Sequence, residues 1–378
     1  MDEEAGVEGE TVVDDRVRMT TGQWLTFEHL HLVGPREHVG CSEPRDASSD
    51  DGYPHRRPPS RCEDWFILID AAPTSVGTVR ARTSLPSQVI TLIAVVVPPL
   101  GLAVAMGLLW NVAFHLVDLL IMLGMYVVCA FGITIGFHRY FTHKGFETST
   151  PVKAALAILG CMTMQGPLTQ WVTDHRKHHA FSDGEGDPHS PHGHGEGVGA
   201  VIKGFVHSHV GWMFRTKGME RGWQYGKDLY DDRLIRWIDW LYLVWVAATL
   251  GIPFLIGYGI GGTDRGVEAM LWGGLVRIFL FQHATFSVNS ICHLYGRRDY
   301  PSRDESRNNW LVAMLVFGEG WHNNHHAFPA SARHGLLRFQ FDASWYLIRA
   351  MERLGLVWNV QLPAQRQLDR RRLQNDAS

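Results

Sequence analysis

Three clusters of histidine are the part of this sequence with the clearest potential for chemistry. They read HRYFTH (138–143), HRKHH (175–179) and HNNHH (322–326). Neutral imidazole is the commonest nitrogen ligand of iron, zinc and copper in proteins. One such cluster would be a weak signal, but three together predict a metal site assembled from distant segments.

The spacing of the histidines differs between the clusters. On an α-helix, residues three and four apart share a face, so each HxxHH cluster can aim three nitrogens at one point. His138 and His143 are five residues apart, which corresponds to about 140° of rotation on an α-helix. Their rings should converge only if the helix ends or bends between them.

The elements that must position these clusters are predicted to be membrane helices. Four apolar segments approach the roughly 20 residues that cross a hydrocarbon core about 30 Å thick. They are 88–110, 116–137, 238–260 and 267–288. Short connections pair them into two hairpins, and Pro98-Pro99 should kink the first segment.

The distribution of basic residues sets the predicted orientation. The loop between the hairpins is rich in Lys and Arg, whereas the tight turns hold only Arg265. By the positive-inside rule, this loop, both termini and all three clusters lie on the cytoplasmic side. For the apolar segment 154–172 we expect an interfacial helix, because a fifth span would separate the second and third clusters. The predicted fold is an all-α integral membrane protein with four transmembrane helices and a helical cytoplasmic cap.

Composition divides the chain into three parts. Residues 1–60 are acidic at the start, then rich in Pro, Ser, Arg and Asp, and carry no signal-peptide pattern, so we expect a disordered leader. Residues 61–360 should form one membrane domain and 361–378 a polar tail. The net charge of −3 gives no indication of nucleic-acid binding, and the five cysteines form no CxxC pair that would predict a zinc knuckle.

The chain resembles the integral-membrane acyl-CoA desaturases, the stearoyl-CoA desaturase family, in its bacterial form. The resemblance runs from about residue 85 to 360. It rests on GITIGFHRYFTH (132–143), DHRKHHAFSDGEGDPH (174–189), HVGW (209–212), NSICHLYG (289–296) and GEGWHNNHHAFP (318–329). In that family the histidines bind two irons, and a histidine and an asparagine of the fourth motif complete the site. The implied ligands are His138, His143, His175, His178, His179, His293, His322, His325 and His326, with Asn289 acting through water.

The residue types agree with two metal ions. Nine nitrogens exceed the coordination of one ion, and no patterned Cys or Met favours copper. Three carboxylates stand beside the clusters, and we expect Asp174, Asp187 and Glu319 to orient imidazole N–H groups. For Asp187, which precedes Pro188, a local turn is an equally good interpretation. That both ions are iron is implied by the resemblance alone.

The resemblance implies an oxidoreductase that uses O2 and two external electrons to introduce a cis double bond, Δ9, into a saturated acyl-CoA. No ionisable side chain deprotonates unactivated methylenes, so acid–base catalysis is excluded and redox chemistry is needed. Trp171 and Thr285 match positions that shape the bend of the substrate tunnel in the family. For a buried Trp, packing is the ordinary alternative.

The acyl carrier follows less directly from the motifs. Arg215 and Lys217 fall near a basic pair that contacts coenzyme A in the family, but the register is shifted by one. Thr173 stands where the family has another basic residue. An acyl-CoA is the expected substrate, and a phospholipid-linked acyl chain is the alternative.

Electrons must come from a separate protein, because the sequence has no cytochrome b5-like HPGG segment and no flavin or nicotinamide signature. A ferredoxin or a flavin-containing reductase is expected to dock on the cytoplasmic cap at the bacterial inner membrane. Arg176 and Lys177 could offer part of that surface, and tunnel-mouth or structural roles are equally good interpretations.

Two other functions stay open. A related membrane hydroxylase uses the same histidine set to insert oxygen, and its product would be an alcohol instead of an alkene. A metal transporter or sensor predicts polar ligands at mid-membrane, whereas the clusters lie at or beyond the ends of the predicted spans. The remaining histidines are more typical of loops or packing, namely His115, His189, His192, His194, His207, His209, His283 and His334.

Overall fold

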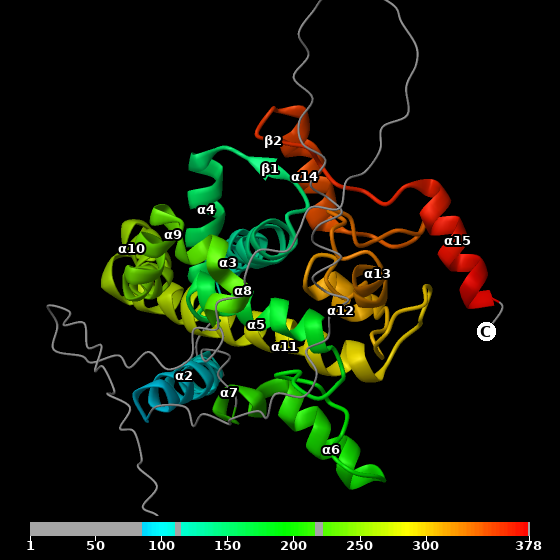
Figure 1. The fold of residues 1–378 in the computed structure, drawn as a ribbon. Helices are drawn as coiled ribbons and strands as arrows, with labels where there is room; N and C mark the ends of the chain where they lie inside the picture. The colour runs from blue at the N-terminus through cyan, green and yellow to red at the C-terminus, as the bar shows by residue number, and fades with distance from the viewer. Residues whose placement is uncertain (1–84, 110–114, 216–221, 377–378) are drawn as a thin grey trace, which may run out of the picture. The chain divides into compact units, whose positions relative to one another are not determined.

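The computed structural model describes residues 85–109, 115–215 and 222–376, and this part of the chain is almost wholly helical (Figure 1). All of it falls within one of the chain's two structural units, 65–378. The predicted leader, residues 1–60, lies outside the described residues, as does Lys217. The prediction of a helical protein with a histidine-rich site is confirmed for the described residues.

Long apolar helices form the part of the fold that was predicted to lie in the membrane. They are α2 (Leu85–Leu109), α3 (Leu116–Phe131) with the π-helix η1 (Gly132–Thr142), and α10 (Tyr242–Met270) with the π-helix η4 (Leu271–Val276) and α11 (Arg277–Leu294). Within the described residues, two continuous helices are long and apolar enough to cross a membrane, Leu116–Thr142 and Tyr242–Leu294. Four separate crossings, and the orientation of the cap, stay predictions.

The helix Tyr242–Leu294 is 53 residues long and folds back on itself. Gly262 leaves the helical conformation with a φ of 75°, which a glycine adopts without strain. The Cβ that Gly273 lacks would meet the Cβ of Pro253 at 2.9 Å, so the two halves lie against each other. The third and fourth predicted segments therefore form the expected helical hairpin.

Arg277 ties this hairpin to the cap. The residue is fully buried. Its guanidinium donates to the Met162 carbonyl at 3.3 Å and to the hydroxyl of Thr249, and its Nε donates to the Gly273 carbonyl at 3.2 Å. These oxygens satisfy a buried charged group that would otherwise be very unfavourable. They connect α11 to α10 and to the turn that follows α4.

The described cap consists mainly of short helices. They are α4 (Thr150–Cys161), α5 (Leu168–Phe181), α6 (Val198–Val206), η2 (His207–Gly211), α7 (Trp212–Arg215), α8 (Gly222–Tyr230), α9 (Arg233–Trp240), α12 (Trp310–Leu315), α13 (His322–Ala327), α14 (Ala343–Arg353) and α15 (Gln365–Asp376). Two short strands, β1 (Glu147–Thr148) and β2 (Val357–Trp358), pair antiparallel and join the chain after η1 to the segment after α14.

The segment 154–172 does not form the single interfacial helix that we expected. It is divided between α4, which ends at Cys161, and α5, which begins at Leu168. Met164 has a φ of 59° and Gly166 a φ of 108°, and neither conformation continues an α-helix. The second histidine cluster therefore lies on a helix of its own.

Close packing of α4 against η1 fixes the first histidine cluster. A Cβ at Gly132 would meet the backbone nitrogen of Gly160 at 2.2 Å, and one at Gly160 would meet the Phe137 ring at 2.2 Å. Only glycine permits so close an approach. The contact holds the first half of η1, which leads directly into HRYFTH, against α4.

The predicted polar tail contains α15, which touches the chain just after the third cluster. Arg371 donates to the Ala327 carbonyl, and its guanidinium lies 4.8 Å from the centre of the Phe328 ring. The tail is therefore packed in part against the cap.

Candidate metal centre

Nine histidines, carried by η1 and the residue that follows it and by α5, α11 and α13, gather in two groups. The five-histidine group consists of His138, His143, His175, His179 and His325. The four-histidine group consists of His178, His293, His322 and His326. Within each group, one ring nitrogen from each residue lies within 4.8 Å of the others. The structure thus brings together every histidine that the resemblance implied as a ligand, while their binding of metal stays a prediction.

The π-helix η1 explains how His138 and His143 converge. In a π-helix the backbone hydrogen bond joins residues five apart, so positions i and i+5 lie above one another. The His143 N–H donates to the His138 carbonyl at 3.2 Å, and the two ring centres are 5.0 Å apart. The hydroxyl of Thr142 donates to the Phe137 carbonyl, again five residues away, at 2.8 Å. In place of the end or bend that we expected in an α-helix, this segment is a π-helix, which ends at Thr142.

Each HxxHH cluster contributes to both groups, which corrects the expectation that it aims three nitrogens at one point. On α5, His175 and His179 join the five-histidine group and His178 joins the other. On α13 the assignment is reversed: His325 alone joins the five-histidine group. On an α-helix, residues four apart lie closer to the same face than residues three apart do. The i, i+4 pair therefore stays together while the middle histidine turns to the second group.

The nitrogen positions fit a metal ion in each group. Nε2 of His325 lies 3.0 Å from Nε2 of His138 and 2.9 Å from Nε2 of His179, and the Nε2 atoms of His293 and His322 are 3.0 Å apart. Two nitrogens each about 2.1 Å from one ion, at right angles to each other, are about 3 Å apart. A single imidazole N–H cannot donate a hydrogen bond to two neighbouring ring nitrogens at once. An ion between them accounts for the convergence.

Buried nitrogens without partners support the same conclusion. Nε2 of His143, His178 and His326 is buried, and the structure gives it no hydrogen-bond partner. An unpaired buried polar atom is costly, so such atoms in a folded protein call for an explanation such as a bound ion. All three belong to the two histidine groups, and the residues present therefore fit a pair of metal ions.

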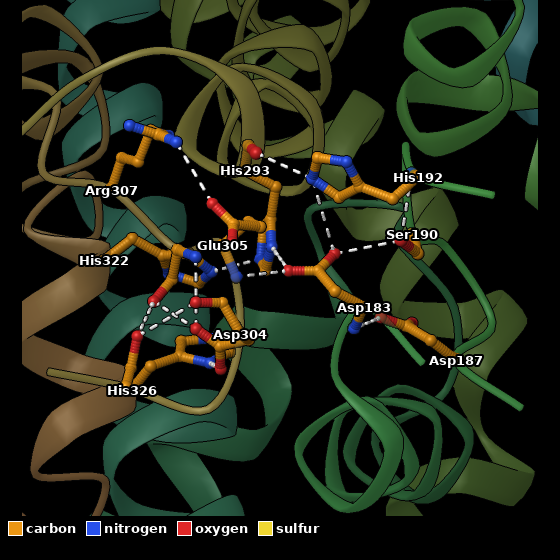
Figure 2. Close-up of polar contacts among 12 residues, drawn as sticks. Asp183, Asp187, Ser190, His192, His293, Asp304, Glu305, Arg307, His322 and His326 are labelled. Atoms are coloured by element: carbon orange, nitrogen blue, oxygen red, sulfur yellow. Dashed lines mark hydrogen bonds and ion pairs between the residues drawn. The ribbon is translucent and has the colours of Figure 1, made fainter. Parts of the chain in front are cut away.

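Carboxylates surround the four-histidine group (Figure 2). Nδ1 of His178 contacts both oxygens of Asp187 at 3.0 Å. Nδ1 of His293 contacts Asp183 at 2.8 Å, and Nδ1 of His326 contacts Asp304 at 2.5 Å. A carboxylate on Nδ1 fixes the tautomer and turns Nε2 toward the metal. Asp187 was predicted from the sequence, whereas Asp183 and Asp304 were missed. For Asp183, the repeated acidic residues of SDGEGDP were the only signal in the sequence.

One carboxylate serves the five-histidine group. Glu319, which was predicted, contacts Nδ1 of His138 and accepts hydrogen bonds from Arg139 at 3.2 and 3.0 Å. Arg139 is fully buried and also forms two hydrogen bonds with Asp342, at 3.1 and 2.9 Å. Asp342 in turn caps α14 by accepting from the Trp345 N–H at 3.0 Å. Sequence reasoning missed Arg139 and Asp342, since neither has ligand spacing.

Burial first, and the neighbouring imidazoles second, lower the pKa of five of these histidines. They are His143, His175, His179, His322 and His325. For His326, burial outweighs the opposing effect of Asp304 and brings the pKa to about 4. Metal ions bind the neutral form of imidazole. Burial therefore keeps these side chains in their ligand form.

The carboxylates of the four-histidine group are held ionised. Burial alone would raise the pKa of Asp183, but the hydrogen bond and charge of His293 outweigh it and bring the pKa to about 2. Burial opposes the same effect at Asp187 and Asp304, whose pKa values are also lowered, by His178 and His326 respectively. Three negative charges therefore stand behind this group at neutral pH.

A cavity of about 150 Å³ reaches the centre from the direction of α2 and α11. Its lining includes Trp171, Thr285 and Asn289 as well as His175 of the five-histidine group. Gln165, which sequence reasoning missed, donates to the Thr285 hydroxyl at 3.1 Å and accepts from the Trp171 indole at 3.3 Å. These contacts place the two predicted tunnel residues and Asn289 on one cavity beside the histidines.

Other predicted residues lie near the centre in different roles. Asp174 is buried and lines the cavity, and its expected role in orienting an imidazole stays a prediction. Arg215 ends α7. Arg176 donates to the carbonyls of Phe141, at 2.7 Å, and Tyr225, at 2.7 Å, so its described contacts fix the chain around η1 and α8. These contacts favour the structural interpretation of Arg176.

Two histidines that were assigned to loops or packing lie against the groups. The His189 ring stacks on His178 with centres 4.3 Å apart and lines the cavity. Nδ1 of His334 lies 3.5 Å from Glu319, and its ring centre is 4.5 Å from that of His325. Elsewhere, His209 contacts Ser290 at 2.9 Å and His283 at 3.0 Å, which agrees with hydrogen-bonding roles.

Comparison with known proteins agrees with this geometry. Residues 115–354 match the sequence profile described as fatty acid desaturase. The chain is 42% identical over 281 residues to a hex-5-enoyl-[acyl-carrier protein] acetylenase of Moorena producens, covering 74% of this chain and 87% of that protein. It is 38% identical to an acyl-CoA 5-desaturase of Anemone leveillei, over 64% of this chain and 71% of the relative. It is also 38% identical to an sn-1 stearoyl-lipid 9-desaturase of Anabaena variabilis, over 62% of this chain and 80% of the relative.

The profile covers most of the chain, including all nine grouped histidines, and the relatives named above carry desaturase or acetylenase activities on fatty acyl chains. The chain therefore belongs to the fatty acid desaturase family and is an oxidoreductase.

Proposed function

We propose that the two histidine groups hold two iron ions and that the protein introduces a cis double bond into a saturated fatty acyl chain. The observation that carries the proposal is the convergence of Nε2 atoms in two adjacent groups beside one cavity. Asn289, which lines that cavity, would complete the four-histidine group through water. When bound, the irons would supply the redox chemistry by which O2 and two external electrons remove hydrogen from unactivated methylenes.

The chain's own residues would hold and orient the substrate. Trp171, Thr285, His175 and Asn289 line the same cavity, so an acyl chain in it would bring one carbon pair to the histidines. Gln165 bridges the indole and the hydroxyl and holds both side chains in place. Fixing one pair of carbons against the reactive centre is the main way in which such a site selects a position. The resemblance of the motifs favours the Δ9 position, and we propose Δ9 insertion.

The nine histidines are held for their role by their surroundings. Glu319, Asp183, Asp187 and Asp304 accept from Nδ1 atoms and leave Nε2 free for the metal. The buried, neutral state of the remaining histidines supports the same arrangement. These contacts, together with the resemblance of the motifs, support the complete ligand set proposed from the sequence.

An acyl-CoA is the carrier that we propose. Arg215 is the last residue of α7, the helix that also contributes Trp212 and Met213 to the cavity lining. The relatives named above act on chains linked to acyl-carrier protein, to coenzyme A and to lipid. A phospholipid-linked chain is therefore the second candidate. The protein would lie in the bacterial inner membrane with its cap in the cytoplasm and receive electrons from a ferredoxin or a flavin-containing reductase.

Fatty acid analysis of a desaturase-deficient host tests the proposal. The host would express the wild-type chain, His178→Ala, or His194→Ala as a matched loss of a histidine outside both groups. We expect a new mono-unsaturated fatty acid with the wild type and His194→Ala, and none with His178→Ala. A hydroxylated product would assign the protein to the hydroxylases. Purified enzyme that desaturates lipid-linked chains and leaves acyl-CoA untouched would overturn the proposed carrier.

A further inference from the structure

The two histidine groups differ in the charges that stand behind them. In the four-histidine group, three of the four rings place Nδ1 against a carboxylate, through Asp183, Asp187 and Asp304. In the five-histidine group only His138 has such a partner, Glu319, among the described contacts. The buried guanidinium of Arg139 pairs with both Glu319 and Asp342, so these three side chains together carry one net negative charge, against three behind the four-histidine group. A cation is therefore more strongly favoured at the four-histidine group.

Asp183 connects the carboxylates of the four-histidine group to one another (Figure 2). Its backbone N–H donates to Asp187 at 2.9 Å, and its Oδ2 accepts from the Glu305 N–H at 2.8 Å. Glu305 directly follows Asp304, the partner of His326. Asp183 thus contacts both His293 and the Glu305 N–H through its side-chain Oδ2, and it contacts Asp187 through its own backbone N–H.

The conformation of Asp183 agrees with this role. Its φ is 58°, in the left-handed region that Asp and Asn tolerate better than most residues. Its second oxygen accepts from the hydroxyl of Ser190 at 2.9 Å. The side chain is thus fixed from two sides, and a carboxylate fixed in this way holds its imidazole in one orientation.

We propose that the four-histidine group binds its ion more tightly than the five-histidine group, and that Asp183 is the positioning residue responsible. The inference rests on the proposed function, because it presumes that each group holds an ion. Loss of one such outer partner typically lowers metal affinity 10–100-fold. We therefore expect three carboxylate partners, against one, to raise metal affinity more than the additional imidazole of the five-histidine group does.

Metal titration of the full chain in lipid nanodiscs tests the proposal. Metal-free protein would be titrated anaerobically with Co²⁺ in competition with a chelator, and the bound ions counted. We expect two steps in the wild type. His322→Ala should remove the tighter step and His143→Ala the weaker one, which assigns the steps to the groups.

The informative variants remove charge and preserve shape. An Asn at position 183 keeps the backbone conformation and an oxygen for His293 and Glu305, and Asn at 304 does the same for His326. We expect Asp183→Asn and Asp304→Asn to weaken the tighter step about 10-fold or more and to leave the weaker step unchanged. Glu185→Gln removes a charge from an exposed side chain of the same loop and should change neither step.

The outcomes of the titration test the difference between the groups, the proposed metal centre and the proposed function separately. Two equal steps in the wild type, a tighter step that belongs to the five-histidine group, or an unchanged tighter step in Asp183→Asn would overturn the inference. Wild-type protein that binds fewer than two ions would overturn the proposed centre itself. A wild type with two assigned steps but no desaturated product would overturn the proposed function and leave the difference between the groups intact.

Discussion

The five-histidine group and the four-histidine group draw on the same two helices, α5 and α13, yet different structures hold them. The five-histidine group depends on the π-helix η1 and on the buried Arg139, which links η1 to Glu319 and Asp342. The four-histidine group depends on α11 and on two loops that supply Asp183, Asp187 and Asp304. One group is positioned by helix packing and an internal salt bridge, and the other by carboxylates on loops.

This difference teaches that similar ligand sets can be given different properties by their supports. Imidazoles of both groups are buried and present Nε2 to the centre. The charge behind each group is set by residues that no ligand motif contains. Variants of the supports should therefore change the metal affinity of one group at a time, whereas loss of a ligand in either group should abolish activity in the same way.

The largest effect is expected from removal of one histidine in either group. His179→Ala removes a nitrogen that lies 2.9 Å from Nε2 of His325, and His326→Ala removes one that is buried without another partner. We expect no desaturated product from either variant, because both ions are needed for the reaction that we propose. Product analysis beside metal counting checks this. Activity in one variant alone would show that a single group suffices.

A smaller effect, on stability, is expected when Arg139 is replaced. Arg139→Met leaves Glu319 and Asp342 buried without their common partner, and breaking a buried ion pair costs about 3–5 kcal/mol. Denaturant unfolding should show this loss, and the five-histidine group should lose its ion before the other group does. Arg349→Met, which breaks a partly exposed pair with Glu352, should cost less than about 1 kcal/mol. Equal losses in the two variants would contradict the structural role of Arg139.

A smaller effect again is expected at Glu319. Glu319→Gln keeps an oxygen for His138 and removes the charge, while Arg139 keeps its pair with Asp342. We expect the affinity of the five-histidine group to fall about 10-fold and that of the four-histidine group to stay the same. Cobalt titration checks the result. A change in the tighter step would mean that the two groups are not independent.

The sequence predicted which histidines come together better than it predicted their arrangement. Histidine spacing and the resemblance placed all nine histidines in one region, and the structure brings them together. The division of each HxxHH cluster between two groups was not predicted, because spacing gives a shared helix face and does not show where a second partner stands. The π-helix was not predicted either, since no residue type in GITIGFHRYFTH is specific to it.

The supports of the centre were the least predictable part. Asp304 lies 22 residues before His326 in the sequence and reaches it only through the fold of the loop after α11. Arg139 reads as a loop charge between two ligands, and its complete burial depends on Asp342, two hundred residues further along the chain. Partners of this kind are set by tertiary packing, which a single sequence does not display.

The smallest effect that we predict concerns the π-helix itself. Thr142→Val removes the hydroxyl that donates to the Phe137 carbonyl at 2.8 Å, and the loss of such a buried bond costs about 1 kcal/mol. Thr163→Val removes a buried bond of the same kind, to the Gly160 carbonyl at 2.7 Å, away from the histidines. Both variants should lose similar stability in denaturant unfolding. Only Thr142→Val should also lower the metal affinity of the five-histidine group, because η1 sets the approach of His143 to His138. Equal metal affinities in the two variants would show that the hydroxyl has no part in holding the π-helix.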